Sequence, residues 1–475
     1  MLGAGTDFDR LLAEARRDVD ANFREHGNAQ FANMIRLTGF DREWARADGA
    51  LLFDAEGREY VDCIAGYAVH AIGRSHPDMI AALCDALRSG QPQWVQFERN
   101  PLAALLAKRL CARAPAALKH VFFSNSGTEA IECALKLARR ATGRSAVLHC
   151  DMAFHGLTLG SLAANGNPKL REGFGPLGDS ECIPFDDLPA LEQALASRRF
   201  SAFLVEPVQG KSCHAASERF LSEAARLCSR AGTLLIVDEV QTGIGRTGRF
   251  LAVEHDPNCE PDIIVLSKAL AGGFVPVGAT LVTKKVWDKT FDSMSRALVH
   301  ASTFQSGVLA MTAGLMTLEI HDRENLSGRT ETLGNQLRND FERLARQHRV
   351  IGAVRGRGLM LGVSLRKSSA ENLLASLPVI GSLEELAFGQ AFVMEMLATH
   401  AVLCQVTESH TNILKFTPPL VVREPECARV VAALDATCRK LSSGVSASVR
   451  GALHAVRNAC FTPTSDPSES KERIV

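Results

Sequence analysis

The sequence carries no excess of charge of either sign. Its 475 residues include 53 acidic and 53 basic side chains, so the formal net charge at pH 7 is +0. A strongly basic face is what draws a protein to nucleic acid or to an anionic membrane surface. We therefore expect neither a nucleic-acid partner nor a membrane partner.

Long hydrophobic runs and paired cysteines are also missing. No apolar stretch reaches the length of a membrane span, and the N-terminal sequence MLGAGTDFDRLLAEARRDVD is too charged for a signal peptide. The 13 cysteines are odd in number and never follow the spacing C-x-x-C, which argues against a zinc site and against a disulfide framework. We expect a cytoplasmic protein with reduced thiols and no metal.

Three short apolar runs each end at a polar residue. They lead into Glu206, into Asp238 and into Lys268, and the runs are Ala202–Val205, Leu234–Val237 and Ile263–Leu266. Runs without polar alternation are typical of buried strands in a parallel sheet, whose ligands bind beyond the carboxyl ends. Two carboxylates and a lysine in one crevice suit pyridoxal 5'-phosphate (PLP), which needs an amine for covalent attachment and an acid opposite its ring nitrogen.

A phosphate site is predicted where the strand Val121–Phe123 gives way to a helix. Ser126 and Glu129 have capping-box spacing, and the turn of small residues presents free backbone N–H groups to an anion. The phosphate would lie on Ser126, Gly127 and Thr128. The alternative for this segment alone is an ordinary capped helix.

Two further clusters fit a flat, heteroaromatic ring. Phe154 follows a strand and is suited to stack on the ring, with His155 beside it; a core phenylalanine and an ordinary loop histidine are the alternatives. Asp238 would face the ring nitrogen, Val240 would pack on a ring face, and Gln241 would bond to the ring hydroxyl. A helix cap or a surface charge would explain Asp238 alone but not the three residues together.

Lys268 and Thr303 complete the candidate site. Lys268 stands between a buried strand and the glycine-bearing sequence ALAGG, where partial desolvation lowers the pKa of an amine and favours attack on an aldehyde. Thr303, in the sequence HASTF, offers a hydroxyl group for a phosphate. A helix cap is the alternative for this threonine.

These motifs together resemble one family, the class III (omega, ornithine and 4-aminobutyrate type) aminotransferases among the fold-type-I PLP enzymes. The resemblance runs from about Met34 to Arg439. The motifs occur in the family's order and spacing, and they are SNSGTEAIECALKLAR, FHG, EPVQG, DEVQTGIGRTG, SKALAGG, HASTF and ILKFTPPL.

The resemblance implies an α/β fold, a large domain with a mostly parallel seven-stranded sheet and a smaller α+β domain. It implies that Lys268 holds PLP and moves the proton, while Asp238 pairs with the ring nitrogen. Glu206 and Gln241 would lie near the ring oxygen, and Phe154 and Val240 on opposite ring faces. Thr303 would reach the phosphate of a neighbouring subunit, which makes the protein a homodimer with shared active sites. The implied reaction is a ping-pong transamination between an amine or amino acid and an aldehyde, ketone or 2-oxo acid.

The chain departs from the family at the substrate positions. The ornithine and aminobutyrate members have a glutamate after EPxxG and an arginine before F-x-P-P-L, whereas this chain has Lys211 and Lys415. Two cations cannot form that ion pair, and lysine lacks the bidentate grip of arginine on a carboxylate. Lys211, Lys415 and Tyr67 are the candidate substrate residues, and the use of glutamate stays open.

Other functions remain compatible with these residues. An aminomutase or a decarboxylating transaminase would use the same cofactor groups, because PLP alone does not select the bond that breaks. A bulky, lipid-like or carrier-tethered substrate is another alternative. A non-catalytic, PLP-binding regulatory protein is disfavoured, because the neutral chain shows no nucleic-acid-binding module and retains Lys268.

We expect four regions along the chain. They are an N-terminal helix and hairpin segment belonging to the small domain (1–65), a large PLP-binding domain (66–325), a C-terminal small domain (326–442) and a partly disordered C-terminal extension (443–475). An apolar insertion near 367–400 would either cover an apolar substrate channel or pack as extra helices on its own domain or at the dimer interface.

Some element boundaries are also predicted. Residues 7–30 have the pattern of a charged amphipathic helix, and residues 49–62 that of a hairpin. Val277–Thr283 should be a strand antiparallel to its neighbours, because a parallel crossover needs a longer connection after Lys268. Val402–Val406 should be one strand of the small domain.

Overall fold

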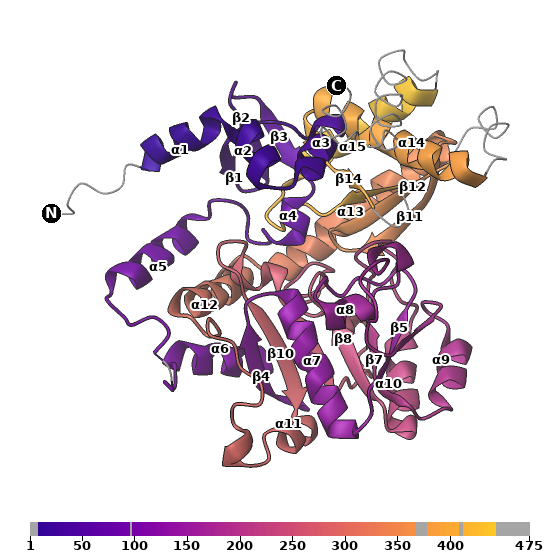
Figure 1. The fold of residues 1–475 in the computed structure, drawn as a ribbon. Helices are drawn as coiled ribbons and strands as arrows, with labels where there is room; N and C mark the ends of the chain where they lie inside the picture. Colours follow the sequence, from indigo (N-terminus) through magenta and orange to yellow (C-terminus); the bar gives the residue numbers. More distant parts are fainter. Residues whose placement is uncertain (1–7, 96, 367–377, 408–411, 443–475) are drawn as a thin grey trace, which may run out of the picture.

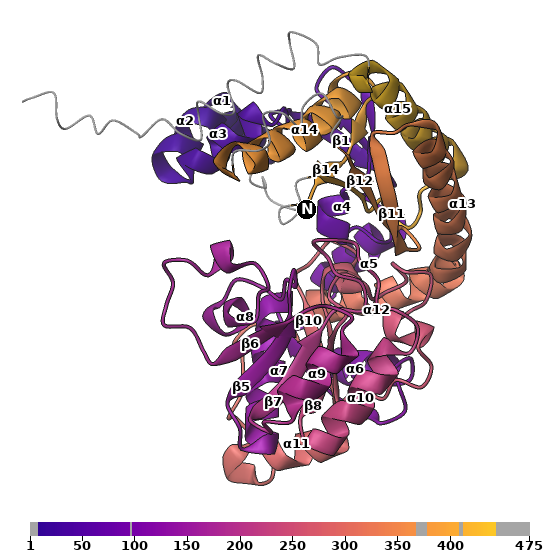
Figure 2. The same cartoon turned by 90° about the vertical axis from the view of Figure 1, so that its right-hand side faces the viewer.

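The computed structural model describes residues 8–95, 97–366, 378–407 and 412–442. Two lobes are visible, a larger one built on a central sheet and a smaller one that contains both the N-terminal helices and the last helices (Figure 1). Helices α12 (Val308–Arg323) and α13 (Leu326–Gln347) follow one another from the large lobe into the small one, as Figure 2 shows.

The large lobe contains a mixed sheet of seven strands in the order β4-β10-β9-β8-β7-β5-β6. Only β10 is antiparallel to its neighbours, and the other pairings are parallel. The strands are β4 (Leu118–Ser124), β5 (Ala146–Cys150), β6 (Ser180–Ile183), β7 (Phe200–Val205), β8 (Leu234–Asp238), β9 (Ile263–Leu266) and β10 (Gly278–Thr283). The predicted fold class and the antiparallel strand after Lys268 are confirmed.

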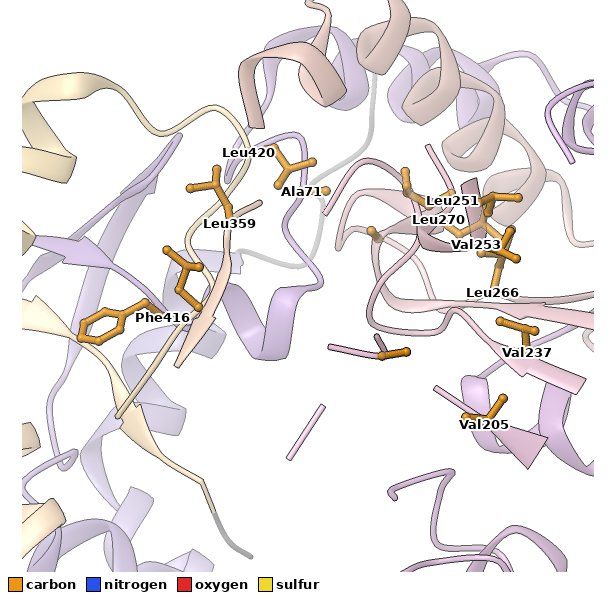
Figure 3. Packing of buried hydrophobic residues seen from close by; sticks show 14 of the residues in the cluster. Ala71, Val205, Val237, Leu251, Val253, Leu266, Leu270, Leu359, Phe416 and Leu420 are labelled. Carbon is orange, nitrogen blue, oxygen red and sulfur yellow. The ribbon is translucent and has the colours of Figure 1, made fainter. Parts of the chain in front are cut away.

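Both faces of this sheet are covered, which explains the unbroken apolar runs. Val205, Val237 and Leu266, labelled in Figure 3, belong to one hydrophobic cluster. The same cluster includes residues of α10 (Phe220–Ala231). The alternate strand residues form a second cluster with α7 (Gly127–Thr142). A strand buried on both faces has no solvent side on which polar residues would alternate.

Shorter helices surround the sheet and connect it to the small lobe. They are α4 (Ala65–Ala68), α5 (Pro77–Arg88), α6 (Pro101–Cys111), α8 (Leu159–Ala163), η1 (Pro168–Leu170), α9 (Leu188–Leu195), η2 (Ala252–His255), η3 (Lys268–Ala271), α11 (Lys284–Thr290) and η4 (Met294–Arg296). None of the helices in the described ranges combines the length and the apolar character needed to cross a bilayer.

The small lobe has an antiparallel sheet in the order β11-β12-β15-β14. Its elements are β11 (Ile351–Arg357), β12 (Met360–Leu365), α14 (Pro378–Ala398), β14 (Gln405–Val406), β15 (Ile413–Phe416) and α15 (Glu424–Ser442). Helix α13 packs against β11 and against α15 and lies along the outside of this lobe (Figure 2).

The N-terminal segment joins the small lobe through a second sheet in the order β1-β2-β3-β13. Its elements are α1 (Phe8–Arg17), α2 (Val19–His26), α3 (Ala29–Leu37), β1 (Trp44–Asp48), β2 (Leu51–Asp54), β3 (Glu59–Asp62) and β13 (Val402–Leu403). The predicted hairpin is present, because β2 and β3 pair antiparallel. The parallel pairing of β13 with β3 supports our proposal that residues 1–65 belong to the small domain, with the large domain at 66–325 and the C-terminal part at 326–442.

Two expectations about these regions were wrong. The single helix over 7–30 is divided, since α1 ends at Arg17 and α2 at His26. The single strand Val402–Val406 is divided between two sheets, because β13 pairs with β3 while β14 pairs with β15.

The insertion near 367–400 is described from residue 378 onward, as helix α14. Phe392, Val393 and Met396 are buried in the main hydrophobic cluster, so this part of the insertion packs on its own lobe. The residues 367–377 and the extension 443–475 lie outside the described residues.

Candidate active site

Three neighbouring strands bring the charged residues together. Strands β7, β8 and β9 run parallel and side by side, so Glu206, Asp238 and Lys268 emerge at the same edge of the sheet. Glu206 and Asp238 are buried, and Lys268 is half-buried at the start of η3 with a φ of 36°. A lysine with this left-handed backbone is held there at a cost by its surroundings, as is typical of functional positions.

The Lys268 amine is set up to lose its proton. Its pKa is lowered from 10.5 to about 8, first by desolvation and then by the positive charge of Lys415. Asp238 and Glu206 act in the opposite direction but do not outweigh these effects. A substantial neutral fraction near pH 8 makes this amine a better nucleophile and base than an exposed lysine.

Both carboxylate oxygens of Asp238 are fixed. Oδ2 lies 2.7 Å from Nδ1 of His155, and Oδ1 accepts a hydrogen bond from the backbone N–H of Val240 at 2.9 Å. The backbone N–H of His155 donates to Oδ1 of Asn165 at 2.7 Å, which anchors the histidine. No sequence pattern singles out Asn165, because it lies ten positions away from His155 in a loop.

The carboxylate of Glu206 is hydrogen-bonded to two backbone segments, one at Phe154 and one at Gly210. Its Oε2 accepts from the backbone N–H of Phe154 at 3.1 Å, and its Oε1 from that of Gly210 at 2.8 Å. Desolvation raises the pKa of Glu206. A methyl group on Gly210 would approach Oε1 of Gln241 to 2.4 Å, so the amide of Gln241 lies against this loop as well.

Ser126, Gly127 and Thr128, the predicted phosphate cup, stand at the start of α7. Ser126 caps the helix, since its Oγ accepts from the N–H of Glu129 at 3.2 Å. A β-carbon on Gly127 would lie 2.9 Å from Val240, so only glycine lets this turn approach the crevice so closely. The hydroxyl of Thr128 lies 2.7 Å from those of Thr158 and Ser161.

The substrate candidates lie at different depths. Lys415, on β15, is buried and donates to the carbonyl of Gly210 at 2.5 Å, and desolvation lowers its pKa. The Nζ of Lys211 lies 4.4 Å from the ring centroid of Phe154, a cation–π distance. Tyr67 is 55% exposed on α4, which packs against η3.

Thr303 lies in the segment that precedes α12. It is exposed, and no hydrogen bond joins it to Ser126, Gly127 or Thr128 in the described part of the chain. Its neighbour Ser302 accepts a hydrogen bond from the side chain of Asn125 at 2.8 Å. Among the described residues, no cluster of three or more histidine, cysteine, aspartate or glutamate side chains could hold a metal ion.

Comparison with known proteins decides the family. Residues 39–438 match the sequence model of class-III aminotransferases. The chain belongs to this family. It is 33% identical over 471 residues to the aminotransferase PigE of Serratia sp. (strain ATCC 39006), covering 92% of this chain and 55% of PigE. The chain thus spans about half the length of that curated relative.

Solved structures of an ornithine aminotransferase and of an omega-transaminase share the fold. Ornithine aminotransferase of Toxoplasma gondii, reported with partial occupancy of PLP at its active site, is 27% identical with a TM-score of 0.79 over 93% of this chain and 99% of that chain. A thermostable (S)-enantioselective omega-transaminase of Thermomicrobium roseum is 25% identical, with a TM-score of 0.79 over 90% and 98%. The family and the fold-type-I architecture are therefore as predicted from the motifs.

The site of this class-III aminotransferase fits PLP, the family's cofactor. The donor set is the one that PLP chemistry requires, an amine with a lowered pKa and a fixed, buried carboxylate. The glycine at 127 leaves room for the approach of a ligand to the helix N-terminus. Residues near the cup that the sequence did not reveal, Thr158 and Ser161, reach Thr128 from the segment after FHG.

Proposed function

We propose that the chain is a PLP-dependent transaminase that moves an amino group from an amine or amino acid to an aldehyde, ketone or 2-oxo acid. One observation carries the proposal: the Lys268 amine, with its lowered pKa, shares a crevice with Asp238, whose carboxylate His155 fixes. When bound, PLP supplies the electron sink that allows a C–H bond of the donor to break.

Each side chain of the crevice has a role in this proposal. Lys268 would hold the cofactor covalently until the donor amine displaces it, and the amine released in this way would then carry a proton between the donor carbon and the cofactor. Asp238 would lie opposite the ring nitrogen as its partner. Phe154 and Val240 would enclose the ring, and Glu206 and Gln241 would lie near its hydroxyl oxygen. Ser126, Gly127 and Thr128 would hold the phosphate.

We further propose a homodimer whose two sites are shared. Several large apolar side chains are exposed within ten positions of His155 or Thr303 in the sequence, and exposed apolar side chains are expected at an interface. They include Leu157, Leu159, Met294, Leu298 and Phe304, with exposures of 61%, 64%, 96%, 68% and 60%. Thr303 would reach the phosphate cup of the partner subunit from this surface.

In this proposal two lysines, Lys211 and Lys415, bind the substrate carboxylate in place of an arginine. Lys415 and Lys211 both lie beside the Gly210 segment, and their positive charges lower the pKa of Lys268. Two ammonium groups attract an anion as point charges, without the planar bidentate geometry that selects an α-carboxylate. We infer that glutamate and 2-oxoglutarate hold no privileged place among the substrates.

The proposal is tested by a panel of amines added one at a time to the PLP-loaded protein without an acceptor. A true donor should abolish the absorbance of the lysine-bound cofactor in one stoichiometric step, and a carbonyl acceptor should restore it. This ping-pong order follows because both half-reactions use the same crevice. A protein whose absorbance survives every amine, or changes only when donor and acceptor are both present, is not a transaminase of this kind.

A further inference from the structure

A pocket lies between the two lobes. Its volume is about 440 Å³, within the range of small-molecule sites. Strand β11 and helix α13 line it from the small lobe, and His214 and His255 line it from the large lobe. None of the residues assigned to the cofactor belongs to its wall.

The wall of this pocket carries unbalanced positive charge. Its single carboxylate, Glu331, already pairs with Arg249 at 3.3 Å. Of its three arginines, Arg338 pairs with a glutamate on its own helix at 3.1 Å. Arg355 and Arg357 form no ion pair and donate no side-chain hydrogen bond within the described ranges of the chain. Two guanidinium groups are thus left without counter-charge.

The two arginines present their charges on one side of β11. They stand at alternate positions of the strand, where side chains share a face, and their pairing with β12 is in continuous register. Both are half-buried rather than extended into solvent. Such a pair repels itself unless an anion binds, because partial burial weakens the screening by water.

The large lobe contributes two histidines and no carboxylate to the wall of the pocket. His255 lies close enough for Arg357 to contribute, after burial, to lowering the pKa of its imidazole. Its Nε2 is within 3.1 Å of the carbonyl oxygen of Thr247. A small adjoining cavity contains Asp256, but that carboxylate accepts from the backbone N–H of Ser222 at 2.8 Å and forms no ion pair with Arg357.

We propose that this pocket is a binding site for a small phosphate-bearing molecule, held by Arg355 and Arg357. Guanidinium forks match the oxygens of a phosphate in pairs, which gives geometric as well as electrostatic preference. A ligand held by β11 and touching His214 would contact both lobes, so its binding stabilises their observed arrangement.

Orthophosphate is the probe, and the holoenzyme is the sample. Because phosphate would also enter the empty cofactor cup, the protein is first saturated with PLP and reduced with borohydride, and mass spectrometry verifies the label. Binding is then measured by calorimetry at constant ionic strength against chloride. A missing label points to a failure of the proposed function, and it is visible before any phosphate is added.

The PLP-labelled wild-type protein should bind one phosphate per chain in a saturable manner. Arg357→Gln and Arg355→Gln should each weaken binding about tenfold or more, as expected for loss of a charge-assisted hydrogen bond. Arg349→Gln removes the same charge from an exposed site just before β11 and should change the affinity less than about twofold. Arg357→Lys should fall between these values.

Two results would overturn the proposal. One is the absence of saturable phosphate binding to the labelled wild-type protein, a measurement that needs no variant to fold. The other is phosphate binding by folded Arg355→Gln and Arg357→Gln proteins with the affinity of the Arg349→Gln control.

Discussion

His155 Nδ1 lies 2.7 Å from Asp238 Oδ2, and both side chains are buried. The residues are 83 positions apart in the chain, yet the sheet brings them into direct contact. A buried carboxylate is costly unless its oxygens are hydrogen-bonded. The imidazole therefore satisfies one oxygen of the carboxylate that our proposed function places opposite the ring nitrogen.

The first prediction concerns this pair. His155→Asn should retain most activity, because the amide N–H of asparagine can take the place of Nδ1. His155→Phe should lower kcat about 10-fold or more, because it leaves a buried acceptor of Asp238 unpaired, which costs roughly 1–3 kcal/mol. Equal losses of kcat in both variants would assign His155 a purely structural role.

The second prediction concerns the amine. Lys268→Ala should reduce turnover about 10⁴-fold or more, because it removes both the covalent anchor and the proton carrier. Lys284→Ala, at an exposed lysine paired with Asp288, is the matched control and should retain wild-type turnover. Borohydride reduction and peptide mapping should find PLP on residue 268. Undiminished turnover of Lys268→Ala would remove the basis of the proposed mechanism.

The sequence was sufficient to predict those strands whose local residue pattern matches their burial in the fold. The runs ending at Glu206, Asp238 and Lys268 are strands buried on both faces, so their composition alone identified them. The division of Val402–Val406 was not predictable, since both halves have the same β-rich pattern and only tertiary pairing sends them to different sheets. The end of α2 at His26 was missed although Gly27 follows it, because a single glycine inside a helical pattern does not by itself end a helix.

The site divides in a similar way. Glu206, Asp238 and Lys268 could be found from the sequence because each follows a buried strand. In a parallel sheet the carboxyl ends of neighbouring strands lie at the same edge, so the three residues were expected to meet. Contacts between distant loops could not: Asn165 reaches His155 from the loop after α8, and Lys415 reaches Gly210 across 205 positions. No local pattern encodes such distances. The roles of the site residues therefore remain predictions to be tested.

A third prediction addresses the substrate lysines. The double change Lys211→Glu with Lys415→Arg should create an ion pair beside Gly210 and a guanidinium that can grip a carboxylate. We expect kcat/KM for 2-oxoglutarate to rise about tenfold in the double variant and in neither single variant, because Lys415→Arg alone faces another cation. The comparison with pyruvate as acceptor controls for general damage. A rise in the single Lys415→Arg variant equal to that of the pair would reject the charge argument.

The fourth prediction tests the shared sites. Heterodimers with one Lys268→Ala subunit and one Thr303→Ala subunit are isolated through two different affinity tags. If Thr303 serves the partner's cup, one site of the heterodimer has both residues intact, and about half of wild-type turnover per dimer should return. If Thr303 serves its own subunit, no site is intact. Turnover no higher than the average of the two parent homodimers would therefore exclude the exchange.

The last prediction follows from the lowered pKa of Lys268. The ordinary value of 10.5 applies to the unfolded chain, and the pKa falls to about 8 in the folded apoprotein. Between these values the unfolded chain binds more protons than the folded one, so the stability of the apoprotein should rise as pH increases across this window. Below about pH 8 the folded state bears the full free-energy cost of burying the protonated Lys268 amine.

Lys268→Met removes that cost, and at pH 7 the variant should be more stable to urea by up to about 3 kcal/mol. The advantage should shrink as pH approaches 10.5. Lys284→Met, at an exposed position, should show no such pH dependence. A Lys268→Met apoprotein that is no more stable than wild type at pH 7 would mean that the amine keeps its solvation in the folded state, and with it the reactivity of an ordinary lysine.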